Sequence, residues 1–354
     1  MQGSGLRATI KHQLSNIHRP LVYTYNMPEL PEVETVKRGL LKLIVGKTIK
    51  FIEHDWPKSF PNSEFDVTSF LVGASIKNVR RRAKVLIIDL STGYSLVIHL
   101  KMTGQMVYVK RKQIEDSRLK NEDAVDEIDP QFSISNSQSL NSEDIRFGAG
   151  HPNDSLIKEL PDKSTRVIFV FNDDSHLYFN DQRKFGWVRL MPTIEVPNID
   201  FMKKVGPEPL EPEFTAEVFI NRIQKRANTT IKAAILDQTV LAGVGNIYAD
   251  ESLWGANIHP ASRVFDVPLA KLKKLHFEIV FVLNLSINKG GSTSRNYVNA
   301  EGKRGSYLEF ARVFRRENLP CPRCATIIKK IRVAGRGTHV CPKCQVLPKK
   351  LVNI

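Results

Sequence analysis

All four cysteines of this 354-residue chain lie near its carboxyl end, in the pattern Cys-x2-Cys-x16-Cys-x2-Cys. They are Cys321, Cys324, Cys341 and Cys344. Each pair reads Cys-Pro-x-Cys, a spacing that allows two tight turns to close one tetrahedral Zn²⁺ site. Four thiolates leave the metal no open position, so we expect one structural zinc ion. Two disulfides are the alternative, which secretion would favour, but nothing else in the sequence indicates secretion.

The region around these cysteines is strongly basic. Residues 301–354 carry 13 Lys and Arg against 3 Glu, in a chain of net charge +15 and pI about 9.6. Such a concentration of positive charge predicts a polyanionic partner. Arg336 is expected in a turn, Gly335-Arg336-Gly337-Thr338, whose glycines allow a backbone to approach a phosphodiester closely. No run is long and apolar enough to cross a membrane.

Residues 113–146 have the opposite character, with 9 acidic and 3 basic side chains among many Ser, Asn and Gln. Apolar periodicity is weak there, so we expect a polar insertion over about 113–161. Its acidic charge has two interpretations. It shields the basic face from nonspecific binding, or it is a simple solvated excursion, which the composition favours.

A start-like motif, Met-Pro-Glu-Leu-Pro-Glu, begins at residue 27. Pro31 and the acidic side chains suit the first turn of a helix. Apolar positions then follow at helical spacing until Gly46 ends the element. Glu29 and Glu32 lie next to Pro28, where two carboxyl groups can supply proton transfer to a reacting centre. The sequence alone leaves both the structural and the catalytic interpretation open.

A third motif occupies residues 231–260, where two predicted helices flank a glycine turn. Gly243 and Gly245 permit backbone amides to converge on a phosphate oxygen. Asn246 is expected to cap the following helix, whose amino-terminal end favours an anion. A helix pair that binds nothing would also accept these residues, but the basic region that follows favours contact with DNA.

Between the first motif and the helix pair the chain reads mostly as strands. Short apolar or alternating runs separated by turns predict a β-sandwich with strands at 84–90, 94–100, 166–171, 176–180 and 186–190. Two polar clusters, 80–84 and 181–186, are expected to interrupt it. A buried Met102 and solvated basic runs are the simple interpretation. Together with Arg183 and Phe185, however, they form the apolar wedge that an enzyme needs to fill the hole left by an extruded base.

These motifs together resemble the formamidopyrimidine-DNA glycosylase family over residues 27–345. The resemblance implies an α+β fold, with an N-terminal β-sandwich flanked by helices, a helical helix-two-turn-helix domain and a C-terminal β-hairpin zinc ribbon. We accordingly expect an extension at 1–26, a catalytic sandwich domain at 27–192, a linker at 193–210, a DNA-binding helical domain at 211–300 and a zinc finger at 301–354.

The resemblance also implies an activity. It is that of a bifunctional DNA glycosylase and AP lyase, which removes oxidised purines such as 8-oxoguanine and formamidopyrimidines and cleaves the strand by β,δ-elimination. In this family the secondary amine of a terminal proline attacks the sugar. A terminal amine titrates about two units below lysine, and its iminium product acidifies the neighbouring sugar protons. The expected partner is double-stranded DNA with oxidised bases or abasic sites. We expect a monomer at the bacterial nucleoid, in the cytoplasm, without a redox cofactor.

The resemblance further assigns roles to individual residues. For catalysis these are Pro28 as nucleophile, Glu29 as proton donor, Lys84 for β-elimination, Arg336 for δ-elimination, and Glu32 and Glu251 as supports. For DNA contact they are Met102, Arg183 and Phe185, inserted into the duplex, together with Asn246, Arg166 and Lys232. Some positions depart from the family pattern. Ser164 and Arg166 replace a frequent His-x-His pair, which puts that backbone contact in doubt, and Ala325 replaces a glycine in a knuckle.

Residues 1–26 contain no Asp or Glu and three basic side chains, so they resemble a transit peptide. An upstream start assigned in place of Met27 is the favoured alternative, and either route would free Pro28. Two other functions remain open. One is an endonuclease VIII-like enzyme for oxidised pyrimidines, against which the Pro-Glu-Leu-Pro-Glu opening argues. The other is a non-catalytic lesion-binding protein in which the Pro28 nitrogen stays acylated.

Overall fold

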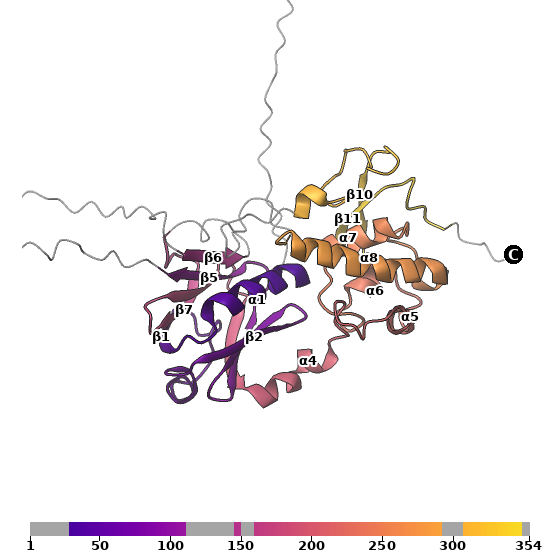
Figure 1. The fold of residues 1–354 in the computed structure, drawn as a ribbon. Coiled ribbons are helices and arrows are strands. Elements are labelled where there is room, and N and C mark those ends of the chain that lie inside the picture. The colour runs from indigo at the N-terminus through magenta and orange to yellow at the C-terminus, as the bar shows by residue number, and fades with distance from the viewer. Residues whose placement is uncertain (1–27, 111–144, 150–158, 292–306, 349–354) are drawn as a thin grey trace, which may run out of the picture.

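The computed structural model describes residues 28–110, 145–149, 159–291 and 307–348, so the extension expected at 1–26 lies outside it. The described residues form a β-sandwich, a helical region and a small hairpin, in chain order. Figure 1 shows the sandwich and the helical region side by side, with α1 at their junction and the hairpin β10–β11 over the helical region.

Two antiparallel sheets make the sandwich. The larger has the strand order β1-β7-β8-β5-β6, and the smaller the order β2-β3-β4-β9. The strands are β1 Ile49–His54, β2 Ile76–Arg82, β3 Val85–Leu90, β4 Tyr94–His99, β5 Gly104–Lys110, β6 Ile145–Ala149, β7 Thr165–Phe171, β8 His176–Asp181 and β9 Trp187–Pro192. The inner faces of both sheets share one apolar core with α1. The predicted α+β fold with a β-sandwich is therefore confirmed.

Helix α1 spans Leu30–Ile44, as the sequence predicts. Pro31 lies in its first turn, and Gly46 follows its end with φ +86°. The apolar stripe of α1 is buried in the sandwich core, but its first turn points elsewhere. The Leu30 N–H donates to the carbonyl of Gly243 at 3.0 Å, so α1 begins against the helical region.

All five predicted strands are present, with ends shifted by a residue or two, and β1, β2, β5 and β6 were not predicted. The basic cluster expected to interrupt the sheet instead extends through β2. Its charges are neutralised by acidic neighbours on other elements. Arg80 Nε lies 2.8 Å from Asp89 Oδ2, and Arg81 Nε lies 2.9 Å from Glu34 Oε2.

The polar insertion expected over about 113–161 contains strand β6. This edge strand pairs with β5 alone, and its Phe147 is buried against Gly39 of α1. A strand of five residues has too little alternation to stand out within a polar stretch. The remaining residues of the insertion, except 159–161, lie outside the described part of the chain.

The helical region consists mainly of α5 Ala216–Gln224, α6 Ile231–Leu236, α7 Asn246–Gly255 and α8 Leu269–Asn288. Shorter helices occur along the whole chain. Between β1 and β2 lie α2 Glu64–Asp66 and η1 Val67–Leu71, and after β9 lie η2 Thr193–Asn198 and α4 Asp200–Lys204. Before and after α8 lie η3 Val264–Asp266 and η4 Tyr307–Phe310. The main four helices share a second apolar core. Within the described ranges, no helix has the length and apolar character needed to span a bilayer.

The segment between the sandwich and the helical region is held firmly at its end. Glu208 Oε2 accepts from Arg81 at 2.7 Å, and its Oε1 accepts from Arg82 at 2.8 Å. Glu208 Oε1 also accepts the Ala83 N–H at 2.5 Å. The turn between β2 and β3 is thereby tied to the start of the helical region.

The hairpin consists of β10 Lys329–Val333 and β11 Arg336–Val340. A small apolar cluster joins it to the helical region, because Trp254 of α7 packs with Val313 and Ile328 beside two of the cysteines.

We predict that Gly39→Ala lowers the free energy of unfolding, although alanine is the better helix former by about 1 kcal/mol. A β-carbon at Gly39 would lie 2.1 Å from Phe147 Cζ, so a buried ring would have to move. Overpacking of this kind costs about 1–3 kcal/mol. Urea denaturation measures the difference. In a Phe147→Leu background the substitution should be much less harmful, and a stabilising effect in the otherwise wild-type chain would contradict the packing of β6 on α1.

Candidate functional site

The amino-terminal ends of α1 and α7 meet at Glu29. Pro28 and Glu29 directly precede α1, and both are buried. Glu29 Oε1 accepts the Ile247 N–H of α7 at 3.0 Å, and the Glu29 N–H donates to Glu32 Oε2 at 3.0 Å. Gly245 makes this approach possible, because a β-carbon there would lie 2.3 Å from Glu29 Cδ. The carboxyl group that follows Pro28 is therefore fixed by a helix from another part of the chain.

Burial raises the pKa of Glu29 from 4.5 to about 7. Lys84 opposes the shift through its charge, while the charge of Glu32 adds to it. Glu29 Oε2 is buried and accepts no hydrogen bond from the described residues. A carboxyl group with a pKa near 7 is protonated in a large fraction of molecules at neutral pH, so it can donate a proton there.

Lys84 enters this site from the turn between β2 and β3. The turn is tight, since Ala83 has φ +51° and Arg82 pairs with Val85. Burial lowers the pKa of Lys84, the carboxyl group of Glu29 opposes the change, and the charge of Arg336 lowers the pKa further. A lysine with a lowered pKa has more of its unprotonated form at neutral pH, which can accept a proton.

Arg336 is the first residue of β11 and is exposed. The sequence suggested that Arg336 lies within a glycine turn. The turn instead falls at Ala334 and Gly335, both with positive φ, and Arg336 follows it opposite Val333. Two residues with positive φ make the tight turn that suits a twisted hairpin. The charge of Arg336 acts on both Lys84 and Lys232, so the hairpin brings Arg336 toward the buried site.

The sequence suggested that Asn246 caps α7, but the structure shows that it does not. Gly245 precedes the helix, and Asn246 is its first residue. The Asn246 Nδ2 donates to the carbonyl of Gly337 at 3.1 Å, while its Oδ1 is buried and unpaired among the described residues. The cap comes from elsewhere, because Glu29 takes the amide of Ile247 that a capping side chain would normally take.

Lys232 and Arg166 are both buried, which does not fit their predicted contact with DNA. Lys232 Nζ donates to Asp250 Oδ1 at 2.6 Å and to Thr338 Oγ1 at 2.7 Å. Arg166 Nε donates to the Asp181 carbonyl at 3.1 Å, and its guanidinium also pairs with Asp55. Each side chain joins separate elements of the fold.

Met102, Arg183 and Phe185 are brought together, as the sequence predicts. Arg183 Nη1 lies 2.9 Å from Met102 Sδ, and its guanidinium carbon lies 5.0 Å from the centre of the Phe185 ring. Phe185 is 56% exposed, which is unusual for a large apolar ring. Asp181 holds the loop beneath them, since its Oδ2 accepts the Gly186 N–H at 2.6 Å.

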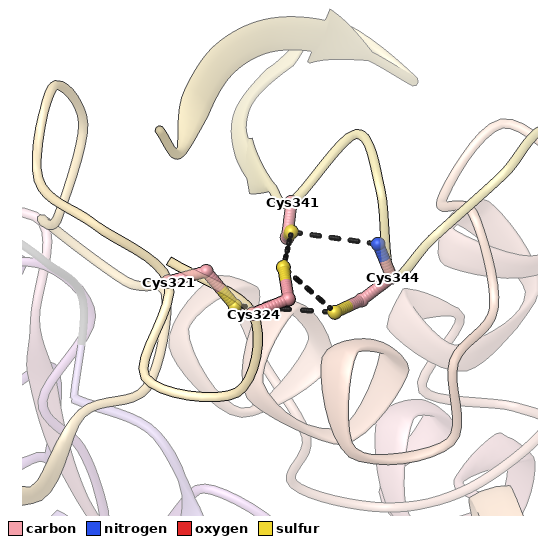
Figure 2. A group of neighbouring side chains, drawn as sticks. All are labelled: Cys321, Cys324, Cys341 and Cys344. Carbon is pink, nitrogen blue, oxygen red and sulfur yellow. Dashed lines mark hydrogen bonds between the residues drawn. The ribbon is translucent and has the colours of Figure 1, made fainter. Parts of the chain in front are cut away.

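The four cysteines converge on one point (Figure 2). All four sulfur atoms lie within 4.8 Å of one another. Separations of 3.4 Å, 3.5 Å and 4.0 Å between pairs of sulfur atoms are far longer than a disulfide bond of about 2.05 Å. They are close to the spacing of about 3.8 Å that tetrahedral Zn–S bonds of about 2.3 Å require. The four thiolates thus fit one structural zinc ion, and the disulfide alternative does not match the geometry.

Several residues that build the site were missed at the sequence level. The Tyr248 hydroxyl donates to Glu32 Oε1 at 2.7 Å, and Asp250 lies fully buried beside the hairpin. The Tyr-Ala-Asp-Glu run of α7 lies within the recognised motif, but helical spacing alone does not indicate which side chains face α1. Glu251, named only as a support, accepts the backbone N–H groups of Arg312, Val313 and Phe314 at 2.8–3.1 Å.

Comparisons with known proteins agree with this architecture. Three family models match along the chain: the formamidopyrimidine-DNA glycosylase N-terminal domain over residues 27–188, the formamidopyrimidine-DNA glycosylase H2TH domain over 205–298, and the zinc finger found in FPG and IleRS over 318–346. A sandwich followed by this helix pair and this zinc finger defines the class of DNA glycosylases built on a helix-two-turn-helix.

Among curated relatives, formamidopyrimidine-DNA glycosylase of Latilactobacillus sakei is 38% identical over 321 residues, covering 90% of this chain and 98% of its own. That of Desulforamulus reducens is 37% identical, covering 88% and 97%. Among solved structures, Lactococcus lactis Fpg in complex with DNA containing an abasic site has a TM-score of 0.70 and 32% identity, covering 90% and 99%. Thermus thermophilus MutM (Fpg) has a TM-score of 0.69 and 31% identity, covering 91% and 100%. This chain belongs to the formamidopyrimidine-DNA glycosylase family.

We predict that Glu29→Gln becomes more stable relative to the wild type as the pH rises. The pKa of Glu29 is about 7 in the folded protein and 4.5 for an unperturbed carboxyl group. Above pH 4.5 the unfolded chain loses this proton while the folded chain keeps it, so the wild type is progressively destabilised up to about pH 7. The relative gain for Gln should reach about 3 kcal/mol and then stay constant.

Urea denaturation of both proteins from pH 4.5 to 8 measures this gain. Glu64→Gln, at an exposed position, is the matched control for the loss of one carboxylate, and any change that it shows with pH is subtracted. A difference for Glu29→Gln that stays constant with pH after this subtraction would contradict the raised pKa of Glu29.

Proposed function

We propose that this protein is a bifunctional DNA glycosylase and AP lyase of base-excision repair, which removes oxidised purines from double-stranded DNA. The observation that carries the proposal is the convergence of Pro28, a Glu29 carboxyl group with a raised pKa, and the buried Lys84. Here Lys84, from the turn between β2 and β3, acts on the carboxyl group that directly follows Pro28, so a nucleophile, an acid and a base would share one place.

The first step would use the lone pair of the Pro28 nitrogen, once this residue is the amino terminus. The N–C1′ bond forms as the bond from C1′ to the damaged base breaks, and Glu29 supplies a proton to the departing base or to the sugar oxygen. Opening of the sugar gives an iminium at C1′, whose charge acidifies the C2′ protons. The raised pKa of Glu29 supports this role, since an ionised carboxylate has no proton to donate.

Two eliminations would follow. Loss of a C2′ proton expels the 3′-phosphate, and a further proton loss expels the 5′-phosphate. Lys84 is suited to the first elimination because its lowered pKa leaves an unprotonated fraction. Arg336, exposed at the start of β11, is suited to bind the phosphate that leaves in the second. Asn246 lies beside the carbonyl of Gly337 and so adjoins the same phosphate path.

The wedge formed by Met102, Arg183 and Phe185 would occupy the duplex where the lesion has left the stack. Extrusion of a nucleotide costs a few kcal/mol of unstacking, and side chains inserted into the void offset part of this cost. The Arg183 guanidinium on the Phe185 ring presents a flat surface to the neighbouring bases. We assign no DNA contact to Lys232 or Arg166, whose buried ion pairs instead support positioning roles.

The substrate class is supported by the structural neighbours. Lactococcus lactis Fpg has been solved with DNA that contains an abasic site and, as a point mutant, with DNA that contains Fapy-dG. An abasic site is the product of base release, and Fapy-dG is a ring-opened purine. Both fit the two steps proposed here, and neither points to the pyrimidine lesions of an endonuclease VIII-like enzyme.

Three further proposals complete this assignment. The functional units are the sandwich at 27–192, the helical domain at 211–300 and the zinc finger at 301–354, joined by 193–210. The active form begins at Pro28, because an acylated nitrogen has no usable lone pair. It acts as a monomer at the nucleoid in the bacterial cytoplasm.

The decisive experiment is borohydride trapping on an 8-oxoguanine duplex, combined with the amino-terminal mass of the protein from its native host. We expect a chain that begins at Pro28, and an adduct whose peptide map places the DNA on the Pro28 nitrogen. Pro28→Gly should lose the adduct. Glu29→Gln should slow base release by about 100-fold or more while it still traps on a preformed abasic site. A protein that keeps residues 1–27 and forms no adduct would contradict the proposed enzymatic function and would favour a lesion-binding protein.

We further predict that alanine at Met102, Arg183 or Phe185 lowers lesion excision at least about tenfold but changes binding to undamaged duplex less than about twofold. The reason is that the wedge acts only when a base has left the stack. Single-turnover excision and fluorescence anisotropy measure the two quantities. Phe277→Ala is the matched control, since this ring is also exposed but lies on α8. Equal losses in excision and duplex binding would contradict the wedge.

A further inference from the structure

A buried polar cluster joins α7 to the hairpin strand β11. We call Lys232, Asp250, Thr338 and His339 the Asp250 cluster. Asp250 Oδ1 accepts from Lys232 Nζ at 2.6 Å. Its Oδ2 accepts the His339 N–H at 2.8 Å and lies 3.2 Å from His339 Nδ1. Lys232 Nζ also donates to Thr338 Oγ1 at 2.7 Å, so one carboxylate organises two consecutive residues of β11.

The cluster is fully enclosed, so its charged groups carry a large desolvation penalty. Lys232, Asp250 and Thr338 are 0% exposed. A buried ion pair is often no more stabilising than apolar side chains of the same volume, so stability alone is a weak reason for one here. Its directional bonds do something that apolar packing cannot, because they set the register of β11 against α7.

What this register controls is the place of Arg336. Thr338 Oγ1 donates to the Arg336 carbonyl at 3.1 Å, and Asn246 holds the carbonyl of Gly337. Arg336 itself is exposed, and no hydrogen bond or ion pair of its side chain is seen among the described residues. At about 3.3 Å per residue, the His339 amide lies only about 10 Å along the strand from Arg336. A shift of His339 relative to Asp250 would therefore move Arg336 by about the same distance as it moves His339.

We propose that Asp250 is a positioning residue for Arg336, and that it controls the second elimination without touching DNA. The inference rests on the proposed function, in which Arg336 serves the loss of the 5′-phosphate. Asparagine cannot replace the carboxylate, because it has one acceptor oxygen where the Lys232 ammonium and the His339 amide require two. Its NH₂ group would face one of these two donors.

The test compares the wild type with Asp250→Asn on a duplex that contains one abasic site. The first elimination alone leaves a 3′-unsaturated aldehyde, and both eliminations leave a 3′-phosphate. We expect the ratio of 3′-phosphate to 3′-aldehyde to fall about tenfold in Asp250→Asn, because small displacements of a catalytic group have large effects on rate. The yield of the borohydride-trapped adduct should stay near the wild-type value.

A double variant separates positioning from general damage. If Asp250 acts through Arg336, then Asp250→Asn should not lower the product ratio further in an Arg336→Ala background. The matched control is Glu278→Gln, which removes a buried carboxylate that pairs with Arg312 at 3.0 Å, away from β11. This control should keep the wild-type product ratio.

A second variant covers the case in which Asp250→Asn does not fold. Thr338→Val preserves side-chain shape but removes the Lys232 acceptor and the bond to the Arg336 carbonyl. It should lower the product ratio in the same direction, with the zinc content unchanged at one ion per chain.

The outcomes distinguish the two levels of the argument. A wild-type protein that gives no trapped adduct or no 3′-phosphate overturns the proposed function. A wild type that gives both, with an unchanged product ratio in Asp250→Asn and Thr338→Val, overturns only the role of Asp250. Equal losses of adduct and 3′-phosphate in both variants also overturn it, because the cluster would then support the fold alone.

Discussion

The hydrogen bond between the Glu29 carboxyl group and the Ile247 amide is the interaction on which the rest of the site depends. Here the residue after Pro28 serves as the cap of a helix that lies more than 200 positions away in the sequence. The bond explains why Gly245 has no room for a side chain. It also means that the helical region, through Ile247, helps to fix the position of the residue that follows Pro28.

Desolvation has the largest effect on the pKa values of Glu29 and Lys84. Glu29 and Lys84 attract each other, and this attraction alone would keep both ionised. Burial has the larger effect on each, so the pKa of the acid rises and that of the amine falls. Each shift enlarges the neutral fraction of its own group at neutral pH. Proton donation and proton acceptance, which a glycosylase and a lyase require in turn, become available from one pair of side chains.

The sequence predicts those features that depend on local spacing. The cysteine knuckles, helix α1 and the five apolar strands all follow from short repeats of residue type, and the structure confirms them. Features that depend on a distant partner were foreseen only where the family resemblance supplied them, as for Met102 and Arg183. From the sequence, Lys232 looks like a surface cation. In the structure it is buried against Thr338, which lies 106 positions later in the chain. From the sequence, the arginines of β2 were predicted to interrupt the sheet. The carboxylates that neutralise them lie on α1, on β3 and on the segment between the sandwich and the helical region, so the sequence pattern could not show them.

The contacts of the zinc ribbon limit how it can be exchanged between proteins. The same kind of finger occurs in FPG and IleRS, which suggests a portable module. In this chain, however, the Trp254 Nε1 of α7 lies 3.4 Å from Cys321 Sγ and donates to it. Glu251 of the same helix binds the backbone amides that lead into the ribbon. A lineage that acquired this finger by recombination would need matching residues on the host helix, so finger and helix are expected to be inherited as one unit.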